Sequence, residues 1–246
     1  MKPLEGLKVI DAATILAAPF AATIMGEFGA EVIKVETPKT GDPMREWGHH
    51  RFEDKCLWWP ILARNKKSVT ANLREAEGQD LVRKLVQSAD VLVENFRPGT
   101  LEKWGLGPED LHKINPGLVI ARVSGFGQTG PNANFPATDA VMQAFSGLMS
   151  VNKDADGLPQ RINLLAIDVV TGLYGFQAVA PALYRRAMQR GTGAGGTHIK
   201  TSLMEAIGAF QSAKMIEYAL EKGETAPLGV PVGMFAAKDG YLNINA

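Results

Sequence analysis

An aspartate, Asp168, stands at the start of a stretch that is apolar on nearly every side, residues 168–186. We interpret this stretch as a buried helix that begins at Asp168. The positive end of a helix dipole favours an ionised carboxylate, and a carboxylate there can act as a covalent nucleophile. Aspartate is also an ordinary N-cap residue. Position alone therefore favours capping and leaves a catalytic role open.

Two segments partly match motifs for nucleotide binding or ester hydrolysis, but the residues or elements around them do not fit those motifs. Residues 191–196 match the pattern G-x-G-x-x-G, but they lead from a helix into a strand, whereas the dinucleotide fingerprint follows a strand and opens a helix. Ser124 lies in a glycine-rich segment, but the nucleophile elbow G-x-S-x-G needs glycine where Arg122 stands. The sequence has no G-x-x-x-x-G-K-[ST] phosphate loop. These observations argue against a dinucleotide-dependent enzyme and a serine hydrolase.

The histidines offer neither a metal site nor a well-placed catalytic base. The sequence has four of them: His49, His50, His112 and His198. The adjacent pair lacks a third ligand at metal-binding spacing, and the other two fall on an expected polar helix and an expected strand, where structural roles are usual. Cys56 is the single cysteine, so an intrachain disulfide and a cysteine-based zinc site are both excluded. We expect no bound metal.

The elements expected around these residues alternate between strands and helices. Short apolar or alternating runs predict strands, and longer runs with apolar residues at helical spacing predict helices. The expected strands are residues 7–11, 31–36, 68–73, 91–93, 118–123, 198–202 and 240–246, and the expected helices are residues 20–28, 75–88, 139–149, 168–186 and 203–221, with Asp139 as N-cap of the third. The pattern predicts an α/β fold, a parallel sheet wrapped by helices, with ligands beyond the carboxyl ends of the strands.

The composition limits the classes of function. The 246 residues include 26 Lys and Arg and 26 Asp and Glu, so the formal net charge is zero and the broad basic surface of nucleic-acid-binding proteins is excluded. A hydrophobic share of 46% supports a sizeable core and excludes disorder. Charges or glycines interrupt the apolar runs before the ~20 residues that cross a bilayer, and the first residues do not resemble a signal peptide. We expect a cytoplasmic protein without nucleic-acid or membrane partners.

Several segments together resemble the class III CoA-transferases, the family of formyl-CoA transferase and carnitine-CoA transferase. They follow the family's order from residue 4 onward, and as a set they are highly specific. The segments are residues 4–11 (LEGLKVID), 29–36 (GAEVIKVE), 41–45 (GDPMR), 65–69 (NKKSV), 89–99 (ADVLVENFRPG), 124–131 (SGFGQTGP) and 168–172 (DVVTG).

The resemblance implies a Rossmann-like CoA-binding large domain, a smaller second domain and an interlocked homodimer. Residues 1–221 would form the large domain, and residues 222–246 would form a linker and the start of the small domain. Family members are longer and include a return segment and a second glycine-rich active-site loop. We therefore expect the 246-residue chain alone to bind CoA weakly and transfer it poorly, and either to self-associate or to need a partner that supplies the rest. We also expect an unpaired strand at residues 240–246.

The resemblance also assigns the chemistry. Asp168 would attack an acyl-CoA thioester to form a mixed anhydride, CoA would then form a thioester with the aspartate, and a small carboxylic acid would take the CoA. No tightly bound cofactor is expected. The CoA contacts implied by matching positions are Ile15, Leu16, Ala17, Ala71, Arg74, Asn95, Phe96 and Lys103, of which Arg74 and Lys103 are the candidates for the phosphates. Thr37 departs from the family pattern, because some relatives have arginine there.

Two alternatives remain open. The α-methylacyl-CoA racemases share this fold, but they place a histidine where this chain has Thr138, and threonine cannot serve as the second acid/base. A non-catalytic CoA-binding or assembly subunit is the other alternative. The loop of residues 47–60, with Trp58 and Trp59, is a candidate for selecting the acid, although paired tryptophans are more often packing residues.

Overall fold

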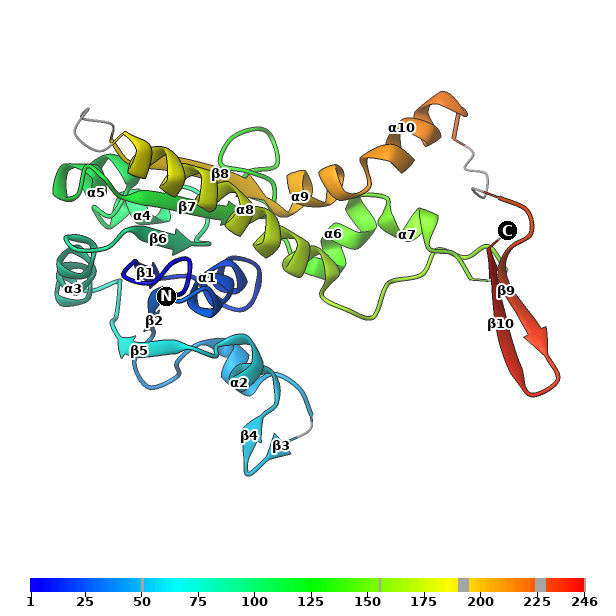
Figure 1. Ribbon diagram of the computed structural model, residues 1–246, viewed down its shortest axis with the longest axis horizontal. Helices are drawn as coiled ribbons and strands as arrows, with labels where there is room; N and C mark the ends of the chain where they lie inside the picture. The colour runs from blue at the N-terminus through cyan, green and yellow to red at the C-terminus, as the bar shows by residue number, and fades with distance from the viewer. Residues whose placement is uncertain (50, 155, 190–194, 224–228, 246) are drawn as a thin grey trace. The chain divides into compact units, whose positions relative to one another are not determined.

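The structure is a computed structural model, and it describes residues 1–49, 51–154, 156–189, 195–223 and 229–245 (Figure 1). The chain divides into two compact units, Met1–Phe210 and Gln211–Ala246. The first unit contains the predicted sheet and the helices that cover it.

In the described part of the first unit, parallel strands form a six-stranded sheet in the order β5-β2-β1-β6-β7-β8. The strands are β1 (Lys8–Asp11), β2 (Glu31–Glu36), β5 (Lys66–Thr70), β6 (Val91–Glu94), β7 (Val119–Ser124) and β8 (Thr197–Ser202). The prediction of a parallel α/β sheet is confirmed. The chain adds strands outward from β1 in one direction and then, starting with β6, in the other. In open α/β sheets this reversal point is where ligands bind.

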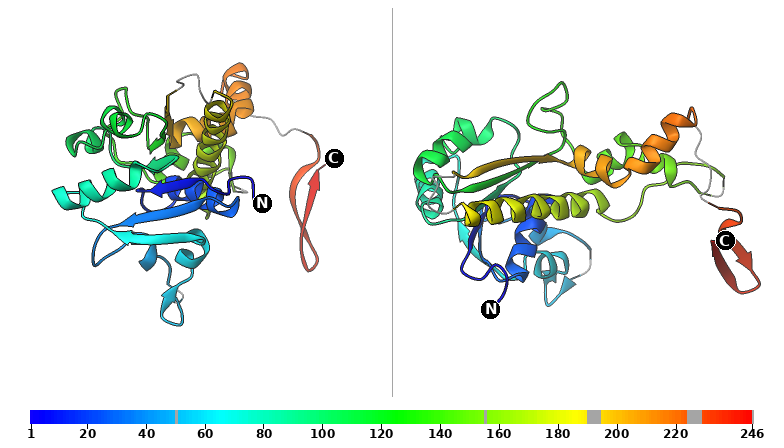
Figure 2. Two further views of the ribbon diagram at one scale, coloured as in Figure 1. Left: turned by 60° about the vertical axis from the view of Figure 1, so that its left-hand side comes forward. Right: turned by 45° about the horizontal axis from the view of Figure 1, so that its top comes forward.

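Helices cover both faces of the sheet, as Figures 1 and 2 show. The helices of this unit are α1 (Ala17–Glu27), α2 (Trp58–Leu62), α3 (Ala76–Val86), α4 (Thr100–Lys103), α5 (Pro108–Ile114), α6 (Asp139–Phe145), α7 (Leu148–Val151), α8 (Ala166–Met188) and α9 (Leu203–Phe210). A short 3-10 helix, η1 (Pro43–Glu46), and a small hairpin, β3 (Arg51–Phe52) with β4 (Lys55–Cys56), precede α2. These short elements form the segment between β2 and β5.

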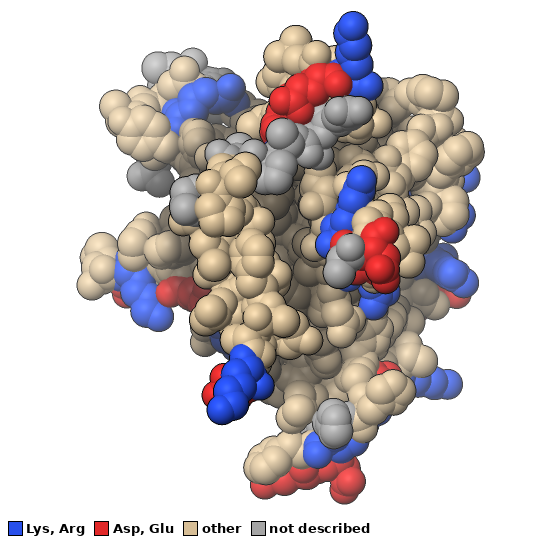
Figure 3. Space-filling model, turned by 90° about the vertical axis from the view of Figure 1, so that its right-hand side faces the viewer, with Lys and Arg blue, Asp and Glu red and all other residues tan. Residues whose placement is uncertain are grey.

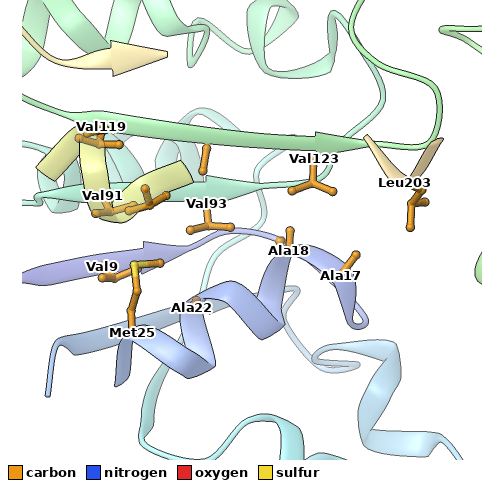
Figure 4. Packing of buried hydrophobic residues seen from close by; sticks show 14 of the residues in the cluster. Val9, Ala17, Ala18, Ala22, Met25, Val91, Val93, Val119, Val123 and Leu203 are labelled. Atoms are coloured by element: carbon orange, nitrogen blue, oxygen red, sulfur yellow. The ribbon is translucent and has the colours of Figure 1, made fainter. Parts of the chain in front are cut away.

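Alternate residues of the central strands contribute to two apolar clusters. Val91 and Val93 of β6 pack in the cluster that includes α1 and α8, whereas Leu92 between them packs in the cluster that includes α3 and α5. Figure 4 shows the first cluster, with the valines of the sheet near Ala18 and Ala22 of α1. Strands buried on both faces are typical of parallel sheets, and this explains why they read as short apolar runs.

The long helix α8 packs along α1 and against β7 and β8 (Figure 2). A side-chain carbon added to Gly172 would lie 2.7 Å from the carbonyl oxygen of Ala17, so glycine permits the two helices to approach closely. By length and composition α8 could also cross a membrane, with a mean hydropathy of 1.3. The core helix of a soluble protein meets the same criteria, and α8 packs against α1, β7 and β8 within the first unit.

Several element boundaries differ from the expected ones. The strand expected at residues 68–73 is β5, which begins two residues earlier, at Lys66. The helix expected over residues 139–149 is divided into α6 and α7, because Gly147 has a left-handed φ of 80° that ends one helix and precedes the other. The helix expected over residues 203–221 is also divided, into α9 and α10 (Ser212–Leu220). The turn expected over residues 191–196 lies mostly outside the described residues, and Gly196 leads directly into β8.

The second unit contains α10 and an antiparallel hairpin of β9 (Val232–Ala237) and β10 (Gly240–Asn245). The expectation of an unpaired strand at residues 240–246 is therefore wrong, because β10 pairs with β9 along its length.

Charged residues form small separate groups of both signs on the face drawn in Figure 3, and uncharged residues occupy most of it. This agrees with the zero net charge of the sequence.

Candidate active site

The loops after β1 and β6 meet at the reversal point of the sheet. The side-chain oxygen of Asn95 accepts a hydrogen bond from the Thr14 N–H at 2.9 Å, and its side-chain nitrogen donates to the Thr14 carbonyl at 2.8 Å. These two hydrogen bonds of Asn95 thus connect the β1–α1 loop to the loop after β6. The prediction for Asn95 was a CoA contact, whereas the structure uses both ends of its amide to hold the backbone beside the site.

The β1–α1 loop has a strained backbone next to this pair. Ile15 has a φ of 68°, a left-handed value that is rare for a β-branched residue. Its N–H donates to the carboxylate of Asp42 at 3.1 and 3.2 Å, and Asp42 pairs with the Lys34 ammonium at 2.8 Å. Strained residues of this kind persist where the surroundings fix them, and they concentrate at functional sites.

A buried cluster of charges lies beneath this loop. Asp11 pairs with Lys66 at 2.7 Å and with Lys34 at 3.6 Å, and all these side chains are at most 3% exposed. Lys66 also donates to the Pro19 carbonyl at 2.7 Å, and Lys34 donates to the Ala13 carbonyl. Burial acts to raise the pKa of Asp11, but the two ammonium groups outweigh it and hold that pKa below its ordinary value. The cluster therefore fixes the backbone on both sides of Ile15.

Asp168 is the third residue of α8, which begins at Ala166 rather than at Asp168 as expected. The residue is 9% exposed, and none of the described residues donates a hydrogen bond to its carboxylate. The aspartate therefore does not cap its own helix. Gly172, one turn later, places α1 against this part of α8.

Asp139 provides the cap that Asp168 does not. One of its carboxylate oxygens accepts from the Ile167 N–H at 2.7 Å and from the Asp168 N–H at 3.1 Å, and Gln143 donates to the other oxygen at 2.6 Å. The expectation that Asp139 caps the helix at residues 139–149 is wrong, because Thr138 occupies the N-cap position of α6. Sequence reasoning missed this role because the two helices are brought together only by folding.

This arrangement makes Asp168 hard to ionise. Burial first, and the neighbouring charge of Asp139 second, raise the pKa of Asp168 from 3.8 to about 7. Asp139 accepts three hydrogen bonds, whereas the carboxylate of Asp168 accepts none from the described residues. Two carboxylates in adjacent places thus have different environments, a pattern that is typical of catalytic sites.

A cavity of about 280 Å³, which we call the aspartate cavity, opens onto Asp168. The predicted residues Ile15, Leu16, Ala17 and Asn95 line it, together with Thr138 and Ser124. The Ser124 hydroxyl is buried and has no hydrogen-bond partner among the described residues, and no sequence motif singled it out for this cavity. Thr138 brings a hydroxyl and no acid/base group, which disfavours the two-base racemase alternative.

A larger cavity of about 680 Å³, the cationic cavity, shares Thr14 with the aspartate cavity. It is lined by the predicted Ala71, Arg74 and Phe96, and also by Lys39 and Arg97, which no sequence motif identified. The three cationic side chains are exposed, and none pairs with a carboxylate among the described residues. The exposed Lys103, on α4, does not line this cavity.

Two carboxylates also line the cationic cavity, but cations neutralise both. Arg45 binds Glu36 through two hydrogen bonds of 2.7 Å, and Lys34 pairs with Asp42. Burial acts to raise the pKa of Glu36, but hydrogen bonds from Arg45, Ser68 and the Asp42 N–H outweigh it and lower this pKa to about 2. The unpaired charge that faces the cavity is therefore positive.

None of the three described histidines lines the aspartate cavity or the cationic cavity. His112 Nε2 lies 3.0 Å from the Leu118 carbonyl, and burial lowers the pKa of His198 to about 4. His49 is exposed, and His50 lies outside the described residues. Within the described ranges, no group of three or more histidine, cysteine, aspartate or glutamate side chains is placed to hold a metal ion.

Comparison with known proteins gives a consistent family. The sequence profile of CoA-transferase family III matches residues 4–246. The succinyl-CoA–D-citramalate CoA-transferase of Chloroflexus aurantiacus is 41% identical, over 97% of this chain and 60% of its own length. The succinyl-CoA:glutarate CoA-transferase of Mus musculus is 37% identical, over 100% of this chain and 57% of its own length.

Solved structures agree with these relatives. The crystal structure of a CAIB/BAIF family protein from Brucella suis has a TM-score of 0.88 and 36% identity, over 98% of this chain and 65% of that one. Rv3272 from Mycobacterium tuberculosis has a TM-score of 0.86 and 32% identity, over 100% of this chain and 65% of that one. The chain therefore spans roughly three fifths of the length of these relatives.

Proposed function

The chain belongs to CoA-transferase family III, and we propose that it moves CoA from an acyl-CoA donor to a carboxylic acid acceptor. Three relatives support the reaction class, because they are named as transferases that act on citramalate, glutarate and oxalate. The observation that carries the proposal is the buried carboxylate of Asp168, to which none of the residues that the structure describes donates a hydrogen bond, in a cavity that adjoins a cationic one.

We propose a covalent mechanism at Asp168. The ionised carboxylate attacks the thioester carbonyl and displaces the CoA thiolate, leaving a mixed anhydride of the acyl group and the aspartate. The thiolate then attacks the aspartyl carbonyl, releasing the donor acid and forming an aspartyl-CoA thioester. The acceptor carboxylate repeats these steps in reverse order. Nucleophilic catalysis of this kind replaces one difficult transfer with easier ones.

The residues around Asp168 support this chemistry. Burial removes water that would otherwise hydrolyse the anhydride, and it leaves the ionised carboxylate poorly solvated and reactive. The carboxylate of Asp139 accepts a hydrogen bond from the backbone N–H of Asp168 and so fixes the orientation of the first turn of α8. Asn95 and Asp42 fix the opposite wall through Thr14 and Ile15.

The two cavities suggest a path for the CoA molecule. The phosphates bind in the cationic cavity near Lys39, Arg74 and Arg97, since unpaired cations at its wall attract phosphate. The pantetheine arm passes Thr14, which lines both cavities, and brings the thioester to Asp168. This path does not use Lys103, the other phosphate candidate from the sequence, because Lys103 lies outside the lining of this cavity.

Trapping the covalent intermediate tests the mechanism. The full-length protein is incubated with an acyl-CoA and then with hydroxylamine, and mass spectrometry of peptides should locate a hydroxamate at Asp168. The Asp168→Asn variant should bind CoA with unchanged affinity and lose transfer. Asp239→Asn, in an exposed turn, is the matched control and should keep full activity. Full turnover by Asp168→Asn would overturn the assignment.

The assembly and location of the protein are also proposals. By resemblance to the family we propose a homodimer that works in the cytoplasm without a tightly bound cofactor. Light scattering after size exclusion measures the mass of the assembly. A monomer with full transferase activity would contradict the proposed dimer.

A further inference from the structure

A third cavity adjoins the aspartate cavity. It has a volume of about 260 Å³, and four residues line both: Trp47, Asp139, Ala140 and Leu165. A group attached to Asp168 therefore has room to extend beyond the reacting carbonyl. We call this space the acid cavity, and it has no role in holding the CoA part of the path proposed above.

The acid cavity has two aromatic walls and a cation. Trp47 and Trp58 meet edge to face, with ring centroids 6.2 Å apart. The guanidinium of Arg161 donates to the side-chain oxygen of Asn163 at 3.1 Å, and both residues line the cavity. Arg161 is exposed and has no carboxylate partner among the residues that the structure describes. The remaining donors of this guanidinium are free to bind an anion.

The segment that carries Arg161 is held in place. Gln143, which is fully buried on α6, accepts from the Ile162 N–H at 2.9 Å and donates to the carbonyls of Ile162 and Leu164, both at 3.1 Å. The same side chain donates to Asp139, which caps α8. One glutamine thus fixes the backbone next to Arg161 relative to Asp168, as a specificity site requires.

We propose that Arg161 binds the second carboxylate of a dicarboxylic substrate whose first carboxylate reacts at Asp168. The inference rests on the proposed function and names its substrate class. A guanidinium binds a carboxylate through paired, charge-assisted hydrogen bonds, and the rings of Trp47 and Trp58 cover the intervening methylene groups. The carboxylate of Asp139 also lines the cavity, so a substrate dianion without a facing cation would be repelled.

The test compares two donors that differ only at the far end, succinyl-CoA and butyryl-CoA. Their affinities are measured by calorimetry and their kcat/KM values in a transfer assay with the full-length protein. Arg161→Gln should lower both the affinity and the kcat/KM for succinyl-CoA by roughly tenfold to a hundredfold. This is the range for a lost hydrogen bond to a charged group. For butyryl-CoA the change should stay below about twofold, which also verifies that the variant is folded.

Two controls separate this effect from others. Arg74→Gln alters the cavity proposed for CoA and should weaken both donors by the same factor, since the CoA part is common to them. Arg51→Gln removes an exposed arginine that pairs with Glu46 and should change neither donor. Arg161→Lys should retain part of the preference for succinyl-CoA, because it keeps the charge and loses the paired geometry.

The outcomes distinguish the two proposals. If Arg161→Gln affects both donors equally or affects neither, the role of Arg161 is overturned and the transferase proposal stands. If the wild-type protein binds succinyl-CoA selectively through Arg161 but transfers no CoA, the proposed function is overturned and the role of Arg161 as a carboxylate-binding residue stands.

Discussion

At the scale of single residues, Asp139 and Asp168 differ because of the groups that surround them. Asp139 accepts hydrogen bonds from two N–H groups of α8 and from Gln143, whereas the carboxylate of Asp168 accepts none within the described part of the chain and is buried beside a second carboxylate. The protein thereby gives hydrogen-bond donors to the aspartate that positions the helix, and the described residues give none to the carboxylate of the aspartate that we propose to react. The pKa of about 7 for Asp168 is the measurable consequence.

This pKa predicts the pH dependence of transfer. The reacting form of Asp168 is the carboxylate, so kcat/KM should fall as the pH is lowered through about 7. Asp139→Asn removes the neighbouring charge and should move the midpoint to lower pH, while burial keeps it above 3.8. Rate profiles from pH 5 to 9 for both proteins measure the shift. Identical midpoints would show that Asp139 does not influence the titrating group.

The same pKa predicts a dependence of stability on pH. Between about pH 4 and pH 7 the folded protein keeps a proton on Asp168 that the unfolded chain has lost, so this residue lowers stability as the pH rises. Asp168→Asn avoids the buried charge and should be more stable than wild type at pH 8, by up to about 4 kcal/mol, with a smaller difference at pH 5. Thermal unfolding at both pH values measures it. Asp239→Asn, in an exposed turn, should show no such trend.

At the scale of elements, the contact between α1 and α8 brings the β1–α1 loop, which lines the aspartate cavity, close to Asp168. Gly172 allows this contact, because any side-chain carbon there would collide with the Ala17 carbonyl and with Phe20. The two helices are separated by about 140 residues of sequence, so glycine at this position has no explanation within α8 itself.

A pair of glycine substitutions tests this contact. Gly172→Ala should destabilise the protein by about 1–3 kcal/mol, the usual cost of overpacking, and should lower CoA transfer by moving Ala17. Gly208→Ala, within α9, has no atom within 4 Å of the added carbon and should be neutral or slightly stabilising. Denaturant unfolding measures both variants. Equal stability of the two would contradict the close approach.

The buried cluster of Asp11, Lys34, Asp42 and Lys66 also links separate elements, through its ion pairs. Lys34→Met leaves Asp11 and Asp42 buried without their shared cation, so we expect a loss of about 3–5 kcal/mol in the free energy of unfolding. Lys67→Met removes the exposed pair with Glu31 and should cost under about 1 kcal/mol. If Lys34→Met were as stable as Lys67→Met, the cluster would not be what holds the strained loop.

At the scale of the whole molecule, CoA would connect both halves of the sheet across its reversal point. Saturating CoA should therefore raise the unfolding temperature, since it binds only the folded state. Arg74→Gln and Arg97→Gln should each reduce this stabilisation, whereas Lys103→Gln should leave it unchanged, because only the first two line the cationic cavity. Higher salt should reduce it as well. A larger loss in Lys103→Gln than in Arg74→Gln would place the phosphates elsewhere.

The sequence by itself predicted the parallel sheet, because the sheet follows from local patterns, whereas the roles of the candidate site residues came from the resemblance to a family. Buried strands such as Val91–Glu94 read as apolar runs, and their loops carry Asn95 and Phe96 where ligands of such sheets bind. The aspartate at position 168 was visible as a lone carboxylate leading an apolar helix. The breaks at Gly147 and after Phe210 were missed, because a helical pattern of apolar residues continues across them.

Tertiary structure alone decided the partners of these residues. Asp139 looks like a local cap in sequence, yet it accepts hydrogen bonds from the N–H groups of a helix that begins 27 residues later. Asn95 lines the aspartate cavity as a loop residue and also binds the backbone of Thr14, which no local pattern indicated. Lys39 and Arg97 come from separate loops and line one cavity. Arg161 and Trp47 likewise come from separate loops and line another. Periodicity records which side of an element is buried, but hydrogen bonds and charge pairing depend on three-dimensional distance, which only the folded chain determines.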